Sequence, residues 1–262
     1  MQAKPNKRPK YRLTVTATES LSNNYQRVTL QGDSIAHFGA ESAGDYIKLL
    51  FTLEGKTDVD TLAEDAKPVI RTYTIRHFDT ETNSIDVDLV RHTTSDLSCG
   101  FAARWATECK VGDTMYIMGP GKKQGINLEA DWYFLAADMT ALPALANTLN
   151  SLPEDAKGYA VIDIIDSTDK QDLTAPEGMN VIWNIQHPEH TLVDVVKSQP
   201  WLDGQCAVWC ACEFDSMRSL RQYFRNEHEI ERDYIYISSY WKDGVTEDGH
   251  KVIKRDDLNA QH

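Results

Sequence analysis

Short runs with the alternation of β-strands, separated by turn residues, fill the first half of the chain. Successive side chains of a strand point to opposite faces, so an apolar residue at every second position indicates a sheet with one buried face. The predicted strands are 12–18, 25–31, 45–53, 70–77, 84–91 and 113–118. The segment 80–83 predicts a hairpin turn between two of them, and 101–109 has helical character. Short strands in such succession are typical of a small antiparallel barrel.

After the turn Gly119-Pro120-Gly121, the predicted elements change from successive strands to strands that alternate with helices. The predicted strands are now 132–137, 159–165, 181–185, 205–211 and 234–240, and the predicted helices are 142–152, 191–197 and 217–226. Strands that alternate with helices indicate βαβ units and a mostly parallel sheet. We therefore expect an α/β protein of two domains, with an antiparallel β-barrel over residues 1–121 and a mostly parallel α/β domain over 122–262. The polar stretch after Gly244 receives no predicted element.

The charge of the chain limits its partners. It carries 40 acidic and 27 basic residues, a net charge of −13, which disfavours binding to nucleic acid or to an anionic membrane. No apolar stretch is long enough to cross a bilayer, and the basic N-terminus lacks the apolar segment of a secretory signal. We therefore expect a cytoplasmic protein that binds neither nucleic acid nor membrane, and nothing in the sequence demands more than a monomer.

Three of the five cysteines cluster on one predicted strand, where Cys206, Cys210 and Cys212 share a face. No fourth Cys or His stands at the spacing of a zinc or iron–sulfur site. Free cysteine behaves as a small hydrophobe, so we interpret these residues as buried thiols and expect no metal site.

The run Arg71-Thr72-Tyr73-Thr74-Ile75-Arg76 concentrates three useful chemical groups on one predicted strand. Alternation places Arg71, Tyr73 and Ile75 on one face and the other three residues on the opposite face. A guanidinium, an aromatic ring and a hydroxyl suit a ligand with a diphosphate, a flat ring and polar ring edges. Taken alone, the run is equally well explained as an ordinary barrel strand with a surface arginine.

Five segments, in this order and at these intervals, resemble the siderophore-interacting protein family, which comprises FAD-containing ferric-siderophore reductases of the ferredoxin-NADP reductase-like superfamily. They are residues 45–51, 71–76, 86–92, 138–144 and 240–244, and the resemblance runs from about residue 12 to residue 244. It implies that the barrel binds FAD and that the second domain binds NAD(P)H.

The family's Arg-x-Tyr-Thr strand lies along the flavin. The resemblance implies that Arg71 contacts the diphosphate, that Tyr73 packs at the isoalloxazine, and that Thr74 bonds near its N5 edge. Tyr73 and Thr74 would therefore be the residues nearest to the chemistry. The next segment to meet the ribityl and diphosphate groups would contribute Asp88, Val90 and His92.

A Gly-Pro-Ala-Ser-like turn then opens a helix in the family, and its free N–H groups hold the diphosphate. Gly100, Ala102 and Ala103 occupy that turn here, and the resemblance makes them FAD contacts. Phe101 stands at the proline position, and Ala103 stands at the hydroxyl position. The insertion 93–97 could supply a hydroxyl instead.

The turn Asp138-Met139-Thr140-Ala141 follows a strand and opens a helix, where a βαβ unit binds phosphate or ribose. It lacks the Gly-x-Gly-x-x-Gly fingerprint. The resemblance nevertheless implies that Asp138, Thr140 and Ala141 contact the nicotinamide dinucleotide, and helix capping by Asp138 or Thr140 is compatible with that role. Asp163 and Asp166 end the next strand, and their carboxylates favour ribose hydroxyls over a 2′-phosphate. NADH is therefore favoured over NADPH.

The segment 209–213 occupies the family's Trp-x-Ala-Gly-Glu position, a loop beside the nicotinamide. The resemblance makes Glu213 a positioning residue there, and it makes Trp241 a cover or border of the isoalloxazine. Cys212 replaces the glycine, and its side chain would narrow the nicotinamide slot or alter the loop dihedrals. Reduced ferredoxin is therefore an alternative electron donor.

Ferric siderophores are usually anionic, so a pocket for them on an acidic protein needs local positive charge. The candidate substrate-binding residues are Lys48, Arg76, Lys242, Lys251, Lys254 and Arg255. A solvated surface charge explains each of them equally well, and only their convergence would indicate a site.

The leading hypothesis is a cytoplasmic FAD-dependent ferric-siderophore reductase, in which NADH gives a hydride to the flavin and single electrons then pass to Fe(III), releasing Fe(II). One alternative keeps this chemistry with ferredoxin as donor. The others are a flavin reductase with another acceptor and a non-catalytic siderophore- or flavin-binding protein.

Overall fold

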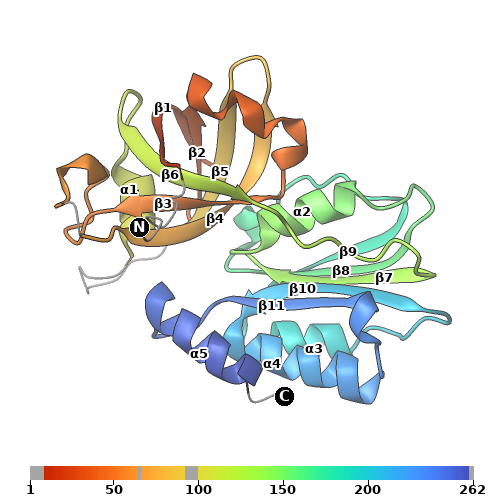
Figure 1. Cartoon of the computed structure of the whole chain (residues 1–262). Coiled ribbons are helices and arrows are strands. Elements are labelled where there is room, and N and C mark those ends of the chain that lie inside the picture. Colours follow the sequence, from red (N-terminus) through yellow and green to blue (C-terminus); the bar gives the residue numbers. More distant parts are fainter. Residues whose placement is uncertain (1–8, 64–65, 92–99, 260–262) are drawn as a thin grey trace, which may run out of the picture. The chain divides into compact units, whose positions relative to one another are not determined.

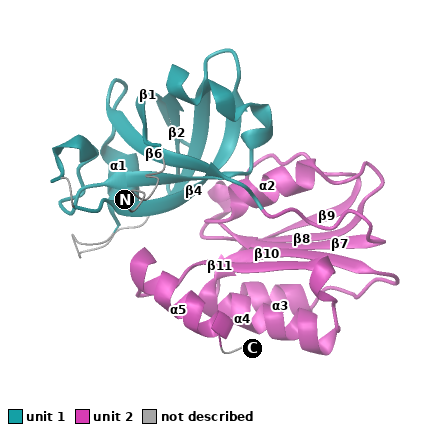
Figure 2. Cartoon of the chain, in the orientation of Figure 1, with its two compact units in different colours: residues 1–123 teal, residues 124–262 magenta. Residues whose placement is uncertain are grey.

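The computed structural model describes residues 9–63, 66–91 and 100–259 of the chain. The chain divides into two compact units, Met1–Lys123 and Gln124–His262, which are coloured separately in Figure 2. The division falls shortly after the last strand of the first unit, β6 (Thr114–Gly121). Each unit has a hydrophobic core of its own, as expected of a domain.

Within the described residues, the first unit is a closed antiparallel barrel with the strand order β1-β2-β5-β4-β3-β6. The strands other than β6 are β1 (Tyr11–Ser20), β2 (Tyr25–Gln31), β3 (Tyr46–Phe51), β4 (Val69–Asp79) and β5 (Ser84–Val90). Figure 1 shows them wrapped around a common interior. The turn predicted at residues 80–83 joins β4 to β5. The prediction of an antiparallel barrel is confirmed.

Alternate residues of paired strands fill the barrel interior. Val28 pairs with Val87 and Leu30 pairs with Ile85 between β2 and β5, and all four side chains are fully buried. The helix α1 (Phe101–Glu108) adds Phe101, Ala102, Trp105 and Ala106 to the same core. Three short 3₁₀ helices complete the unit: η1 (Asp33–Phe38), η2 (Ala40–Ser42) and η3 (Val59–Thr61).

Strand β4 carries the run that begins at Arg71, and its register changes within that run. Tyr73 packs against the barrel core and Ile75 lies inside it, as the alternation predicts. The pairing with β5 then shifts between Ile75 and His77, which is the mark of a β-bulge. After the bulge Phe78, beyond the predicted run, points into the core, so the alternation of the run does not continue past it.

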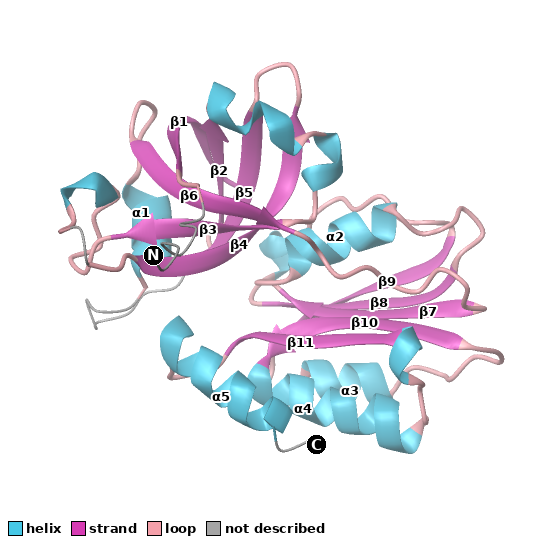
Figure 3. Cartoon of the chain, viewed as in Figure 1, coloured by secondary structure: helices cyan, strands magenta, loops and turns pink. Residues whose placement is uncertain are grey.

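The second unit is built on a parallel sheet with the order β11-β10-β7-β8-β9. Its strands are β7 (Trp132–Asp138), β8 (Lys157–Ile164), β9 (Gly178–Ile185), β10 (Cys206–Glu213) and β11 (Ile235–Trp241). Figure 3 shows α2 (Leu142–Asn150) on one face of this sheet, with α3 (Leu192–Lys197), α4 (Phe214–Gln222) and α5 (Glu247–Asn259) on the other. The remaining helical turns are η4 (Ser167–Asp169), η5 (Tyr223–Glu227) and η6 (Arg232–Tyr234). The prediction of a mostly parallel α/β unit is confirmed.

The cysteines of β10 lie in the core between the sheet and the helices α3 and α4. Cys206, Cys210 and Cys212 are each at most 1% exposed, and they pack with Phe214 and Met217 of α4. They are free thiols, as the sequence predicted. Within the described ranges, no group of His, Cys, Asp and Glu side chains is arranged to hold a metal ion.

The stretch after Gly244, which received no predicted element, forms the helix α5. His250 is its one buried residue among those described. Of its larger apolar residues, Ile253 packs against the core of the unit while Val252 and Leu258 are exposed, so they do not mark one buried face for a sequence pattern to detect. Among the described helices, none combines the length and the apolar character needed to cross a membrane.

Candidate functional site

Arg71 and Arg104 lie against the same aromatic ring at the start of α1. The guanidinium carbon of Arg71 is 5.6 Å from the Phe101 ring centroid, and that of Arg104 is 5.2 Å from it. Arg71 also donates to the carbonyl of Ile70 at 2.9 Å. No carboxylate among the described residues forms an ion pair with Arg71. Two cations thus meet the positive end of the α1 dipole at one place.

The first turn of α1 offers backbone donors to a ligand. Gly100 precedes the helix with φ +65°, and no side chain caps the amides that follow. Ala102 and Ala103 are each 2% exposed, so their side chains are buried and a ligand would meet them through their backbone N–H groups. A diphosphate would bring the negative charge and acceptor oxygens that this turn and Arg71 lack. The residues present therefore fit FAD at the predicted position.

The side chain of Asp88, on β5, already forms an ion pair with Arg27. Arg27 donates Nε to Oδ1 at 2.7 Å and Nη2 to Oδ2 at 2.8 Å, and Arg76 Nε lies 3.7 Å from Oδ2. The hydrogen bond to Asp88 raises the pKa of Arg27. A contact between Asp88 and a cofactor would therefore use its backbone, as would a contact through the neighbouring Val90. His92 and the insertion 93–97 lie outside the described residues.

Two more predicted residues of the barrel lie on β3 and β4. Thr74 is 8% exposed and pairs with Tyr46, so little of its side chain reaches solvent. Lys48 stands across from Thr72 on one side and from Met118 on the other. In the described part of the chain, Lys48 forms no ion pair with a carboxylate. Of the two basic residues predicted to bind substrate in this unit, Lys48 is unneutralised and Arg76 is shared with Asp88.

In the second unit, Asp138 joins the carboxyl ends of three strands. It ends β7 and is 5% exposed. Its Oδ1 accepts the backbone N–H of Thr140 at 2.9 Å and the Thr140 hydroxyl at 2.5 Å. Its Oδ2 accepts the indole N–H of Trp241, from the end of β11, at 2.7 Å. Burial raises the pKa of Asp138, and the bonds from Thr140 and Trp241, with the nearby backbone N–H of Glu213 at the end of β10, act in the opposite direction.

Ala141 lies between this carboxylate and α2. Its N–H donates to the carbonyl of Asp138 at 3.1 Å, and no side chain caps the helix. Pro143 follows within the first turn, where its missing N–H costs nothing. Asp138, Thr140 and Ala141 thus lie together at the sheet edge where parallel α/β units bind ligands.

Asp163 lies beside Asp138 at the end of β8, since the two residues are register partners. Burial raises its pKa to about 6, and the charge of Asp138 adds to the shift. The side-chain amide of Asn184 donates to Asp163 Oδ1 at 2.6 Å. Asp166 instead caps η4 through Thr168 and carries no such burial. Both carboxylates that favoured NADH in the sequence already have protein partners.

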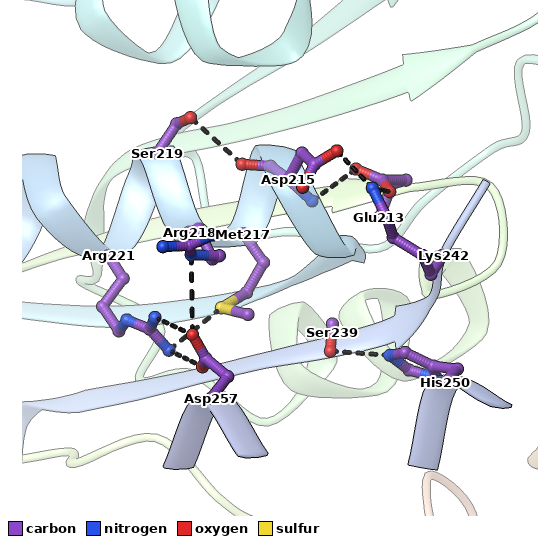
Figure 4. A network of polar contacts seen from close by, with 10 residues as sticks. All are labelled: Glu213, Asp215, Met217, Arg218, Ser219, Arg221, Ser239, Lys242, His250 and Asp257. Carbon is purple, nitrogen blue, oxygen red and sulfur yellow. Dashed lines mark hydrogen bonds and ion pairs between the residues drawn. The ribbon is translucent and has the colours of Figure 1, made fainter. Parts of the chain in front are cut away.

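Glu213 closes the end of β10 and begins α4. Its carboxylate accepts the N–H groups of Asp215 at 2.6 Å and Ser216 at 3.2 Å, so it is the N-cap of that helix. Lys242 Nζ lies 3.6 Å from Glu213 and also donates to Asp215, as Figure 4 shows. Lys242 is therefore neutralised within its own unit.

The three basic residues predicted on the C-terminal stretch point to different partners. Lys251 pairs with Glu247 at 3.1 Å and with Asp248 at 3.3 Å on its own helix, and the exposed Arg255 lies 3.8 Å from Asp256. Lys254 donates to Ser238 Oγ at 2.6 Å and to the carbonyl of Ser239 at 3.0 Å, and burial lowers its pKa. These residues do not converge on one site within α5.

Two residues that attach α5 to β11 and α4 were not predicted from the sequence. His250 Nε2 lies 2.8 Å from Ser239 Oγ of β11, and Asp257 receives a bidentate pair of hydrogen bonds from Arg221 of α4 at 2.7 and 2.9 Å (Figure 4). Neither residue belongs to a motif. Only the i, i+7 spacing of two polar residues on a helical stretch could have suggested a shared face.

Cys212, expected to narrow a nicotinamide slot or to alter the loop dihedrals, is buried in the core beneath α4. A hydrogen bond with Cys210 and burial raise the pKa of its thiol well above the ordinary value. Its side chain therefore packs within the unit and does not project from the loop.

A six-stranded barrel followed by a five-stranded parallel sheet with helices on both faces defines the ferredoxin reductase-like class. Two family models match in the same order: the siderophore-interacting FAD-binding domain over residues 14–124 and the siderophore-interacting protein model over residues 130–244. The chain belongs to the siderophore-interacting protein family.

Individual relatives agree with this assignment. The chain is 30% identical over 243 residues to the ferric vibriobactin reductase ViuB of Vibrio cholerae, covering 88% of each chain. It is 30% identical over 205 residues to a ferric acinetobactin reductase of Acinetobacter baumannii, covering 76% of this chain and 68% of that one. Its fold matches the siderophore-interacting protein SipS of Aeromonas hydrophila with a TM-score of 0.83 and 29% identity, covering 96% and 99% of the two chains.

Proposed function

We propose that this protein is a cytoplasmic FAD-dependent ferric-siderophore reductase that takes electrons from NADH, or from NADPH, and releases iron as Fe(II). One observation carries the proposal: both halves of the chain match the family models in order, and relatives aligned over most of its length are named as reductases of ferric siderophores.

The first unit would hold FAD, which when bound accepts a hydride and passes single electrons to Fe(III). Arg71, Arg104 and the first-turn amides of α1 offer positive charge to its diphosphate. Tyr73 and Thr74 follow Arg71 on β4, and we propose that they orient the isoalloxazine. No protein acid or base is needed at the iron, so the residues of this unit act by binding and orientation.

The second unit would hold the nicotinamide dinucleotide at the carboxyl edge of its sheet. Thr140 and Ala141 are available there, and Asp163 and Asp166 contribute negative charge that disfavours a 2′-phosphate. NADH is the proposed donor for this reason. The buried position of Cys212 supports a nicotinamide as the donor, because its side chain does not project from the loop.

The substrate would be an anionic ferric chelate. Fe(III) held by hard oxygen ligands leaves most siderophores negatively charged, and Lys48 offers a charge that no described carboxylate neutralises. Fe(II) is held more weakly by such ligands, so reduction releases it.

An anaerobic absorption spectrum tests the proposal. The purified protein, supplied with FAD, should be yellow, should bleach on addition of NADH, and should recover its colour when a ferric siderophore is added. Fe(II) should appear in an indicator chelate in proportion to the donor consumed. If NADPH alone or reduced ferredoxin alone bleaches the protein, that compound is the electron donor and not NADH. If the protein binds no FAD, the assignment as a flavin-dependent reductase is wrong.

A further inference from the structure

Asp138 receives hydrogen bonds from three donors on two separate segments. Thr140 supplies its backbone N–H and its hydroxyl to Oδ1, and Trp241 supplies its indole N–H to Oδ2. An N–H group can only donate, and one faces each oxygen of Asp138, so both oxygens accept. Burial raises the pKa of Asp138 and these donors oppose that shift, and the geometry favours the ionised carboxylate, which accepts at both oxygens and offers no proton of its own.

The same geometry assigns the proton of the Thr140 hydroxyl. A hydroxyl has one proton, and at 2.5 Å the Thr140 Oγ1 directs it to Asp138 Oδ1. Thr140 is half-buried, so part of the residue remains open to a ligand. Its Oγ1 then has only lone pairs left to offer, and we expect it to accept hydrogen bonds from a ligand bound there.

Trp241 depends on the same carboxylate. Its side chain is 37% exposed, and exposed indoles ordinarily change rotamer freely. The 2.7 Å bond to a buried carboxylate, whose other oxygen is held by Thr140, fixes both the direction of the indole N–H and the plane of the ring. Asp138 thus couples an aromatic surface at the end of β11 to a polar group at the end of β7.

We propose that Asp138 is a positioning residue that fixes the Trp241 ring and makes the Thr140 hydroxyl an acceptor, so that Thr140 selects a hydrogen-bond donor of the dinucleotide. The ligand half of this inference rests on the proposed function. A phosphate is excluded at Thr140, because its oxygens are acceptors and would face a second acceptor backed by a buried negative charge. The matching groups of a nicotinamide dinucleotide are a ribose hydroxyl and the carboxamide NH₂.

The positioning half can be tested without any cofactor. The chain has six tryptophans, so protein labelled with ¹⁵N in tryptophan gives six indole N–H resonances, and Trp241→Phe identifies the one of interest. We expect it to be shifted downfield and protected from exchange in the wild type, and to move and exchange at least about tenfold faster in Asp138→Asn. Asp163→Asn is the matched control, because Asp163 is the buried neighbour in register, and it should leave the resonance in place.

An unshifted, fast-exchanging Trp241 resonance in the wild type would overturn the positioning role, even if Asp138→Asn fails to fold. A folded Asp138→Asn protein with an unchanged resonance would overturn it as well.

The ligand half is tested by binding of NAD⁺ and of its 3-acetylpyridine analogue, which lacks the amide N–H. Thr140→Val should weaken NAD⁺ binding about five- to tenfold, and Thr140→Ser should restore it. A loss confined to NAD⁺ identifies the carboxamide as the partner, whereas an equal loss for both compounds identifies a ribose hydroxyl.

Unchanged affinity in Thr140→Val would overturn the acceptor role. A wild type that binds neither compound would overturn both the ligand half and the proposed nicotinamide donor. The indole measurement would still decide the positioning half, and FAD uptake would still decide the flavin assignment.

Discussion

His250 Nε2 and Ser239 Oγ lie 2.8 Å apart, and both residues are at least 96% buried between α5 and β11. Burial lowers the pKa of His250, and the neighbouring Lys254 and Lys251 lower it further, whereas Glu247 and Glu213 act in the opposite direction. The C-terminal helix is thus seated on the sheet by a neutral imidazole.

The first prediction concerns the pH dependence of this seating. A histidine whose folded pKa lies below its ordinary value of 6.5 contributes stability that is present above that value and is lost as the pH falls through the folded pKa. We expect the amides of α5 to exchange hydrogen faster, after correction for intrinsic rates, as the pH falls below 6.5. His250→Gln should abolish this dependence. Equal pH dependence in the two proteins would show that another group controls the helix.

The second prediction concerns Asp163, which should make the free energy of unfolding fall as the pH rises, whereas His250 makes it fall as the pH drops. Burial raises its pKa from 3.8 to about 6, so the folded state holds its proton more tightly than the unfolded state does. Its contribution to the free energy of unfolding is therefore greatest below pH 4, falls between pH 4 and 6, and is lost above 6, by at most about 3 kcal/mol.

Asp163→Asn keeps an acceptor for Asn184 and removes the charge. The variant should gain stability relative to the wild type as the pH rises from 4 to 7, measured by urea unfolding at each pH. A constant difference across this range would contradict the assigned burial of the charge.

The ion pair between Arg27 and Asp88 gives a third prediction. The Asp88 side chain has no exposed surface, and Arg27 supplies both of its short hydrogen bonds. Arg27→Ala would leave a buried carboxylate with Arg76, 3.7 Å away, as its one remaining ion-pair partner among the described residues, at a cost of about 2–4 kcal/mol in unfolding free energy. The double variant Arg27→Met with Asp88→Leu should recover most of that loss. A double variant as unstable as the single one would show that packing, and not the charge, causes the loss.

The two periodicities of the sequence were sufficient to predict both units. Strand alternation identified the barrel, and alternating strands and helices identified the parallel sheet. The helix α5 was not predicted, because polar contacts of His250 and Asp257 and the packing of the single residue Ile253 hold it to its unit, and these give no apolar repeat. The hydrogen bond between Asp138 and Trp241 could not be predicted, because 103 residues separate the two and only the folded sheet brings them together.

Motif positions could be predicted, but side-chain partners could not. Thr140 was expected to face a ligand, yet its hydroxyl proton is already donated to Asp138. Lys242 and Lys251 were expected to attract an anion, yet each has carboxylates beside it. A sequence gives the type of charge at a position, whereas neutralisation depends on distances that only the structure supplies.

Arg71 gives a prediction for cofactor affinity. It lies over Phe101 without a carboxylate partner among the described residues, so its charge is available to a diphosphate. Arg71→Ala should weaken FAD binding about ten- to a hundredfold, measured by recovery of flavin fluorescence on dilution, and Arg71→Lys should recover part of the affinity. Riboflavin, which lacks the diphosphate, should bind equally to all three proteins. A parallel loss of riboflavin would indicate a general disturbance of the barrel.

The last prediction separates two lysines that the sequence could not distinguish. Lys48 has no ion-pair partner in the described part of the chain, whereas Lys251 lies within 3.3 Å of both Glu247 and Asp248. Lys48→Ala should raise the KM for an anionic ferric siderophore about three- to tenfold with little change in kcat, and the effect should shrink as salt is added. Lys251→Ala, the matched control, should leave KM within about twofold, because a neutralised charge attracts an anion weakly. Equal effects of the two substitutions would mean that long-range charge, and not a contact at Lys48, governs substrate capture.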